Sequence, residues 1–146
     1  MDDSTLKELI KTEVDKWNNL TAVHIAAGEF RDVETLSYLY EKGGDVNAKN
    51  STRNSTPLNE AAMFGNVDCI VYLYETAGVD INSTDIDGET CLHHAVSNSH
   101  TELVEYLLTK TDINTDIENE DEKTPYLIAK QWEDQEIMDL FKQHKL

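Results

Sequence analysis

One stretch of the chain decides the fold: Thr56-Pro57-Leu58-Asn59-Glu60-Ala61-Ala62. Related stretches begin at Thr21 (Thr-Ala-Val-His-Ile-Ala-Ala), at Thr90 (Thr-Cys-Leu-His-His-Ala-Val) and at Thr124 (Thr-Pro-Tyr-Leu-Ile-Ala-Lys). The four threonines are 35, 34 and 34 residues apart. A nearly constant period of this size is typical of a repeat array, in which one supersecondary unit is stacked along an axis.

Each unit is predicted to hold two helices and a long connector. Thr56-Pro57 starts the first helix, because the threonine hydroxyl accepts from a free backbone N–H, while proline gives up only an N–H that had no partner. Ala61-Ala62 lets this helix approach its neighbours closely, and Gly65 ends it. An apolar-rich second helix follows, and an extended connector then leads to the next threonine.

Two further motifs recur in order with the threonine stretch. A turn pattern Asp-x-x-Gly begins at Asp85, and Asp-Val/Ile-Asn begins at Asp45, Asp80 and Asp112. With these motifs the sequence resembles the ankyrin repeat from about Trp17 to the C-terminus. The resemblance implies an all-α fold: an ankyrin-repeat solenoid of stacked helix-turn-helix units with β-hairpin-like connecting loops.

We expect a single domain over residues 1–146. Thr5-Leu6-Lys7-Glu8 forms a capping box at the head of an apolar stripe, which predicts an N-terminal capping helix over 1–17. Repeats 1, 2 and 3 are predicted at 18–50, 51–84 and 85–117. Residues 118–146 are predicted to form repeat 4 and the C-terminal cap.

The sequence predicts no catalytic, cofactor-binding or metal site. Known nucleophile, phosphate-loop, dinucleotide and zinc-protease motifs are missing from the sequence. His93 and His94 are adjacent, so on a helix they point about 100 degrees apart, whereas zinc needs three or four converging ligands. The resemblance implies a structural role for His24 and His93. Both cysteines, at positions 69 and 91, are predicted to be inert packing residues.

Charge narrows the class of partner. The formal net charge is −17, with 29 acidic and 12 basic residues. No cluster of lysine and arginine is present to bind nucleic acid or an anionic membrane, so a basic partner is favoured. The alternative is that the acids serve solubility alone. No apolar run approaches the roughly 18 residues of a membrane span, and no apolar signal core begins the chain, so we expect a cytoplasmic or nuclear protein. We also expect a monomer.

The resemblance implies that partners bind at the connector tips and at the exposed end of each first helix. Phe64 and Trp132 are predicted as aromatic anchors, because interface centres favour aromatic residues ringed by polar groups. The alternative is that either ring packs inside the fold. The complete set of candidate protein-binding residues is Thr52, Arg53, Glu60, Met63, Phe64, Ile86, Asp87, Glu89, His94, Ser97, Asn98, Glu120, Asp121, Gln131 and Trp132.

We therefore expect a non-catalytic protein–protein interaction module that acts as a regulator, inhibitor or adaptor. Its concave groove would bind a basic or amphipathic segment of another protein. Two alternatives stay open. The protein could be a chaperone or masking factor for a basic client protein, or it could resemble the ankyrin proteins that inhibit kinases. A further alternative is a modification substrate, because Leu39 and Asp45-Val46-Asn47 match the pattern on which ankyrin asparagines are hydroxylated.

Overall fold

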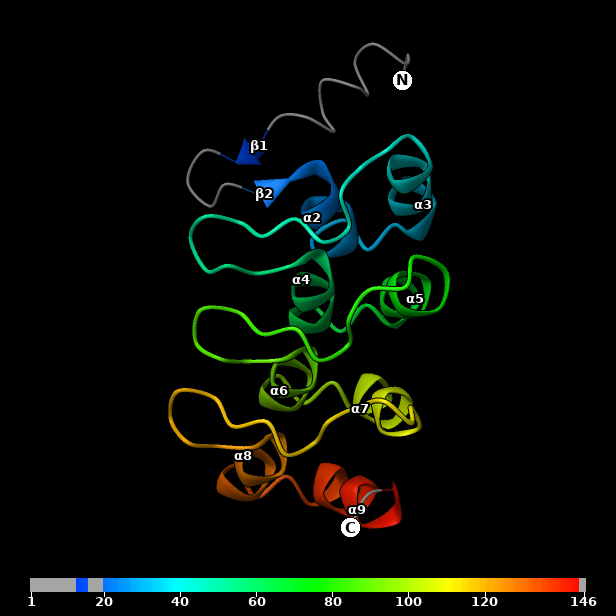
Figure 1. Ribbon diagram of the computed structural model, residues 1–146. Coiled ribbons are helices and arrows are strands. Elements are labelled where there is room, and N and C mark those ends of the chain that lie inside the picture. The colour runs from blue at the N-terminus through cyan, green and yellow to red at the C-terminus, as the bar shows by residue number, and fades with distance from the viewer. Residues whose placement is uncertain (1–12, 16–19, 145–146) are drawn as a thin grey trace.

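The computed structural model describes residues 13–15 and 20–144, and their helices stack in pairs along one axis (Figure 1). A short antiparallel pair, β1 (Glu13–Asp15) and β2 (Leu20–Thr21), precedes the first helix, with Glu13 opposite Thr21. The predicted capping helix over 1–17 lies outside the described residues except for 13–15. Those three residues correct the prediction, because they pair with β2 as a strand and are not helical.

The first helices of the repeats form one column: α2 (Ala22–Ala27), α4 (Pro57–Met63), α6 (Cys91–Ser97) and α8 (Pro125–Gln131). Each begins after a repeat threonine, whose hydroxyl accepts from the backbone N–H three residues later. Neighbouring helices of this column contact one another in chain order. Ala27 and Ala62 are fully buried there, since small side chains allow close approach.

The second helices form a parallel column: α3 (Val33–Glu41), α5 (Val67–Val71), α7 (Thr101–Leu108) and α9 (Gln135–His144). In the second repeat, α5 continues into a π-helical turn, η1 (Tyr72–Thr76). Asp80 stands ten positions after Ile70, whereas Asp112 stands eight positions after the equivalent Val104. The wider π turn accommodates part of this extra length without breaking the helix.

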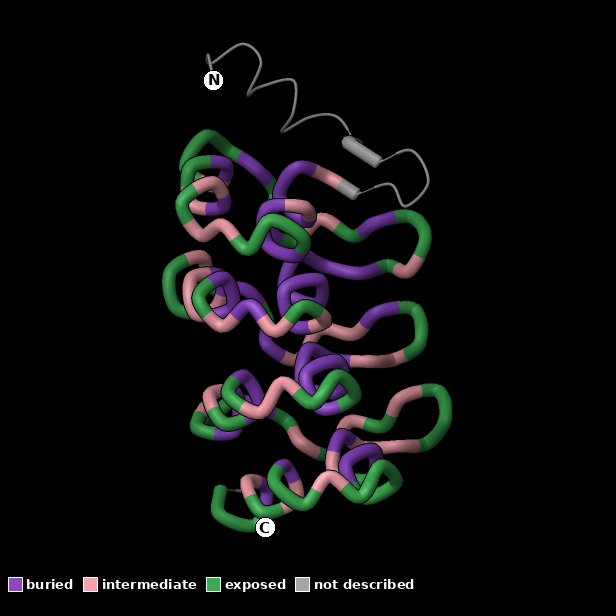
Figure 2. Tube along the Cα trace, turned by 180° about the vertical axis from the view of Figure 1, so that it is seen from behind, coloured by how far each residue is buried: buried purple, intermediate pink, exposed green. Residues whose placement is uncertain are grey.

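The core lies between the two helix columns, and the tips of the connecting loops are exposed (Figure 2). Leu36, Ile70, Leu103 and Ile137, one from each second helix, are fully buried against the first-helix column. The described part of the chain is thus an all-α solenoid of stacked helix-turn-helix units, as predicted, with β1 and β2 as its short strands.

The connecting loops project to one side and are hairpin-like. Asn50, Asp85 and Asn119 occupy equivalent places, and the side-chain oxygen of each accepts from two backbone N–H groups of its own loop. Neighbouring loops also bond through their backbones: the N–H of Ile86 donates to the carbonyl of Arg53 at 2.7 Å, and Glu120 donates to Asp87 at 2.9 Å. The loops therefore form a connected edge along the stack.

Two buried histidines connect consecutive repeats. The Nε2 of His24 donates to the carbonyl of Ser55 at 2.8 Å, and that of His93 donates to the carbonyl of Lys123 at 3.0 Å. Each carbonyl stands just before the next repeat threonine. Burial lowers the pKa of both rings, which keeps them neutral with the proton on Nε2.

The second repeat has Asn59 in the place of these histidines. Its side chain is fully buried, and neither its amide nitrogen nor its oxygen has a hydrogen-bond partner among the described residues. The equivalent acceptor would be the carbonyl of Glu89, which stands just before Thr90. The shorter side chain leaves this junction without the histidine bond.

We predict that Asn59→His stabilises the protein by about 1 kcal/mol, because the longer ring can donate to the Glu89 carbonyl and removes an unsatisfied buried amide. The free energy of unfolding from urea denaturation measures the effect. His93→Asn is the matched control and should lower stability by a similar amount. An unchanged or reduced stability in Asn59→His would show that the junction does not accept this bond.

Candidate protein-interaction surface

Most of the predicted binding residues lie on the accessible surface formed by the loop tips and the ends of the first helices. Half-buried among them are Arg53, Met63 and Glu89. The exposed members are Thr52, Phe64, Ile86, Asp87, Ser97, Asn98, Glu120, Asp121, Gln131 and Trp132. The loops project beyond the first-helix column on one side of the stack (Figure 1).

The two predicted aromatic anchors are both at helix ends. Phe64 follows α4 and Trp132 follows α8, at the same register two repeats apart. Their exposed fractions are 37% and 68%, so neither ring is buried in the core. The guanidinium of Arg31 donates to the backbone carbonyl of Phe64 at 2.8 Å, which fixes the main chain that carries the ring.

Glu60 and His94 differ from expectation, because both are buried. Their exposed fractions are 9% and 4%. The sequence register places them on the loop-facing side of α4 and α6, but the loops fold back over that side. Asn50 Nδ2 lies 3.4 Å from a Glu60 carboxylate oxygen, and an oxygen of Asp85 lies 2.9 Å from His94 Nε2. His94 therefore interacts within the protein and is not an accessible binding residue.

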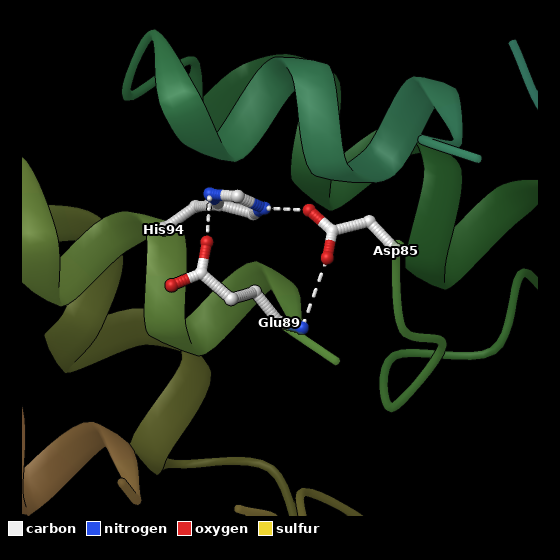
Figure 3. A group of neighbouring side chains, drawn as sticks. All are labelled: Asp85, Glu89 and His94. Carbon is white, nitrogen blue, oxygen red and sulfur yellow. Dashed lines mark hydrogen bonds and ion pairs between the residues drawn. The ribbon is translucent and has the colours of Figure 1, made fainter. Parts of the chain in front are cut away.

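His94 lies between two carboxylates (Figure 3). Its Nε2 faces Asp85, and its Nδ1 lies 3.5 Å from an oxygen of Glu89. Carboxylates only accept hydrogen bonds, so the ring can donate to both at once only as the protonated imidazolium. The Nη2 of Arg53 also approaches the same Asp85 oxygen at 3.6 Å and an oxygen of Asp87 at 3.3 Å. We call Arg53, Asp85, Asp87, Glu89 and His94 the junction charge network.

Asp85 is the centre of this network. Burial acts to raise the pKa of its carboxyl, but hydrogen bonds from His94 and from the backbone N–H groups of Glu89 and Asp87 outweigh it, so the pKa is lowered. Oδ1 receives the two backbone bonds, and Oδ2 receives the His94 bond. Both oxygens of the Asp85 carboxylate thus accept hydrogen bonds. The sequence pattern indicates only that Asp85 belongs to a turn.

A metal ion is the other chemistry that this cluster suggests. One ligand atom from each of Asp85, Glu89 and His94 lies within 4.8 Å of the others. A metal site would need both carboxylates and the lone pair of one His94 nitrogen to point at the same place. Instead, the two carboxylates approach different nitrogens of the His94 ring (Figure 3). With the Arg53 guanidinium already beside Asp85, the arrangement fits an ion-pair network better than a metal site.

A hollow of about 320 Å³ opens between the loop before α4 and the ends of α2 and α4. Its lining consists of Glu29, Asn50, Thr52, Arg53, Glu60, Met63 and Phe64. Sequence reasoning missed Glu29 and Asn50. Glu29 stands eight residues after Thr21, as Phe64 does after Thr56, so applying the same register to the first repeat would have found it. The neighbouring Phe30, 69% exposed, was missed for the same reason.

The remaining reactive groups are buried thiols. Burial raises the pKa of Cys69 to about 11 and that of Cys91 to about 12, so both stay protonated near neutral pH. Cys91 Sγ donates to the carbonyl of Ile81 at 3.2 Å. Both residues therefore behave as packing groups. Among the described residues, none of the helices has the length and apolar character needed to cross a membrane.

We predict that Asp85→Asn lowers the free energy of unfolding at neutral pH by about 1–2 kcal/mol. Asparagine can still hold the loop, as Asn50 and Asn119 do, so the loss isolates the charge interactions with His94 and Arg53. The native pKa of Asp85 is lowered, so its contribution is complete above the unfolded value of 3.8 and is lost as pH falls below it.

Urea denaturation of both proteins between pH 7 and pH 2.5 checks this. The stability difference should shrink below about pH 4. Asp87→Asn, which removes an exposed carboxylate of the same network, is the control and should have a smaller effect. A difference that stays constant down to pH 2.5 would contradict the electrostatic origin.

Comparisons with known proteins agree with the architecture. A family model for ankyrin repeats, in many copies, matches residues 23–74 and 58–108, which together cover more than half of the chain. A rice protein (Oryza sativa subsp. japonica) named "Probable E3 ubiquitin-protein ligase XBOS31" is 37% identical over 92 residues, 63% of this chain and 20% of that protein. Alpha-latrocrustotoxin-Lt1a from Latrodectus tredecimguttatus is 40% identical over 83 residues, 56% of this chain and 6% of the toxin.

This chain thus spans only a small part of the length of either relative. The threonine caps, the paired helix columns and the hairpin-like loops agree with the family match. Ankyrin repeats indicate a protein–protein interaction module, and the family is generally non-catalytic. The chain belongs to the ankyrin-repeat family.

Proposed function

We propose that this protein is a non-catalytic, monomeric interaction module that binds a basic or amphipathic segment of another protein. The segment lies in the angle between the loop edge and the first-helix column, the concave groove of the stack. The observation that carries the proposal is the pair of accessible aromatic rings, Phe64 and Trp132, at the same register of two repeats. Aromatic side chains on a polar surface are the usual anchors of protein interfaces.

Charge supports the nature of the partner. Asp87, Glu120 and Asp121 are exposed at the loop tips, close to the same angle, and the chain carries a net charge of −17. Such a field attracts a basic segment and speeds association, while repelling phosphate backbones and anionic lipid. Asn47, the candidate hydroxylation site, is also exposed. We regard its modification as an addition to binding and not as the function.

We propose a cytoplasmic or nuclear setting for the protein. Cys69 and Cys91 are both free, which fits the reducing environment of the cytoplasm or nucleus. As a second candidate, we propose masking or chaperoning of a basic client, favoured over kinase inhibition by the strong acidic charge.

We predict that Phe64→Ala combined with Trp132→Ala weakens the complex with a partner by roughly thirtyfold or more, since loss of an anchor costs about 2 kcal/mol. Affinity capture from a native lysate, followed by titration of the recovered partner, measures the change. Tyr38→Ala is a matched control, because Tyr38 has the same 37% exposure as Phe64 but lies on α3 in the second-helix column.

Equal retention of partners by the double variant would remove the aromatic surface from the proposal. The two candidate functions differ in salt dependence. A client bound through its basic charge should dissociate as salt rises, because screening weakens exposed charge pairs. A partner that is unaffected by salt and is not basic would favour the inhibitor alternative.

A further inference from the structure

The hollow between the first two repeats has a buried carboxylate in its lining. Glu60 lines the hollow, but only 9% of its surface is exposed. Its hydrogen bond to Asn50 is long, because Asn50 Nδ2 lies 3.4 Å from Glu60 Oε1. Burial raises the pKa of the Glu60 carboxyl and outweighs the opposing effects of Ser55 and of the charges of His94 and Arg53. The negative charge of Glu29, at the exposed end of α2, adds to the rise. The ionised form of Glu60 is thus incompletely compensated within the protein.

The nearest candidate cation is already engaged elsewhere. Arg53 also lines the hollow, but its guanidinium pairs with Asp87 at 3.3 Å and with Asp85 at 3.6 Å, both in the next loop. Within the described part of the chain, no lysine or arginine lies within ion-pair distance of Glu60 or Glu29. The hollow therefore holds two carboxylates, while the cation in its lining is paired with the next loop.

Phe64 and Met63 supply an apolar wall beside these carboxylates. Phe64 is 37% exposed, and its ring lies against the end of α2. A Cβ added at Gly28 would lie 3.3 Å from Phe64 Cδ2 and 3.2 Å from Glu60 Cβ. Glycine at this position therefore lets both side chains pack closely against the first repeat, and the Arg31 bond holds the backbone of Phe64.

An aromatic face next to carboxylates is the environment that an arginine side chain prefers. The guanidinium is planar and weakly hydrated, stacks on aromatic rings and donates to carboxylates with two N–H groups at once. Lysine carries a compact and strongly hydrated charge, so it gains less from the ring. An apolar side chain would bring no donor to either carboxylate.

We propose that this hollow is an anchoring pocket for one arginine side chain of the bound partner. Glu60 and Glu29 receive the guanidinium, while Phe64 and Met63 cover its aliphatic stem. The inference rests on the proposed function. It specifies that the groove binds an arginine of the partner segment between the first and second repeats. Trp132, two repeats away, contacts a different part of the same segment.

The test uses the whole chain and the peptide acetyl-Gly-Gly-Arg-Gly-Gly-amide, followed by backbone NMR. We expect saturable shifts at Gly28, Glu29 and residues 60–64, and not at residues 120–122 of the last loop. The lysine peptide should bind several-fold more weakly, and the citrulline peptide, which keeps the shape but lacks the charge, should give no saturable shift.

Variants assign the contacts. Glu60→Gln keeps the size of the side chain but removes its charge, and should weaken the arginine peptide about tenfold. Glu29→Gln changes an exposed residue that the fold does not need, and should weaken it several-fold. The matched control is Glu120→Gln, an exposed acid on the loop before α8, which should leave the affinity unchanged.

Three results would overturn the pocket. Shifts spread over the acidic surface, equal for arginine and lysine peptides, would show a nonspecific effect of charge. Equal binding of the citrulline peptide would show that the occupant is not a cation. Shifts confined to Ser97 and Trp132 would move the arginine site along the groove while leaving the interaction module intact. The proposed interaction function is tested separately, by the capture experiment with the Phe64 and Trp132 variants.

Discussion

The stack depends on buried hydrogen bonds between consecutive repeats, and at two junctions a histidine of one repeat donates this bond to a loop carbonyl of the next. The His24 ring receives the Thr21 hydroxyl on Nδ1 at 2.8 Å and donates to Ser55 from Nε2, and His93 does the same with Thr90 and Lys123. Each accepting carbonyl also closes its own hairpin, because the backbone N–H of Asn50 donates to Ser55 and that of Asn119 donates to Lys123. One neutral ring thereby sets the helix start, the loop and the spacing between repeats.

The proposed binding surface lies on the edge that these bonds hold in place. The loop backbones are bonded across repeats, and Arg53 is drawn toward Asp85 and Asp87, away from Glu60. Side chains fixed before binding lose less conformational entropy when a partner arrives. The same arrangement that ties two loops together also leaves Glu60 and Glu29 to a cation from outside. Fold and proposed recognition thus share residues but use different atoms.

Threonine caps, the Thr-Pro helix starts and the aliphatic second helices were readable from the chain, because their causes are local. The ankyrin resemblance correctly placed Phe64 and Trp132 on the surface. The burial of His94 was not predictable, since it depends on how the loop carrying Asp85 folds back over α6. The π turn at η1 was also missed, because added residues between α5 and Asp80 suggest a longer exit as readily as a widened helix turn. Strand β1 lies where apolar spacing favoured a helix.

Asn59 has a consequence for how the array loses its structure. In a linear array, stability is close to a sum of repeat terms and nearest-neighbour coupling terms, and opening begins at the weakest coupling. Two of the junctions are coupled by neutral, buried bonds that salt does not screen. The junction between the second and third repeats lacks this bond. It is held by the packing of α4 on α6, by the Ile86–Arg53 backbone bond, by a bond from His100 Nε2 to the carbonyl of Met63 at 2.8 Å and by the junction charge network. Among the described residues, the Lys and Arg ion pairs join these two repeats, so ionic strength and acidity act more strongly on their coupling than on that of the other two junctions.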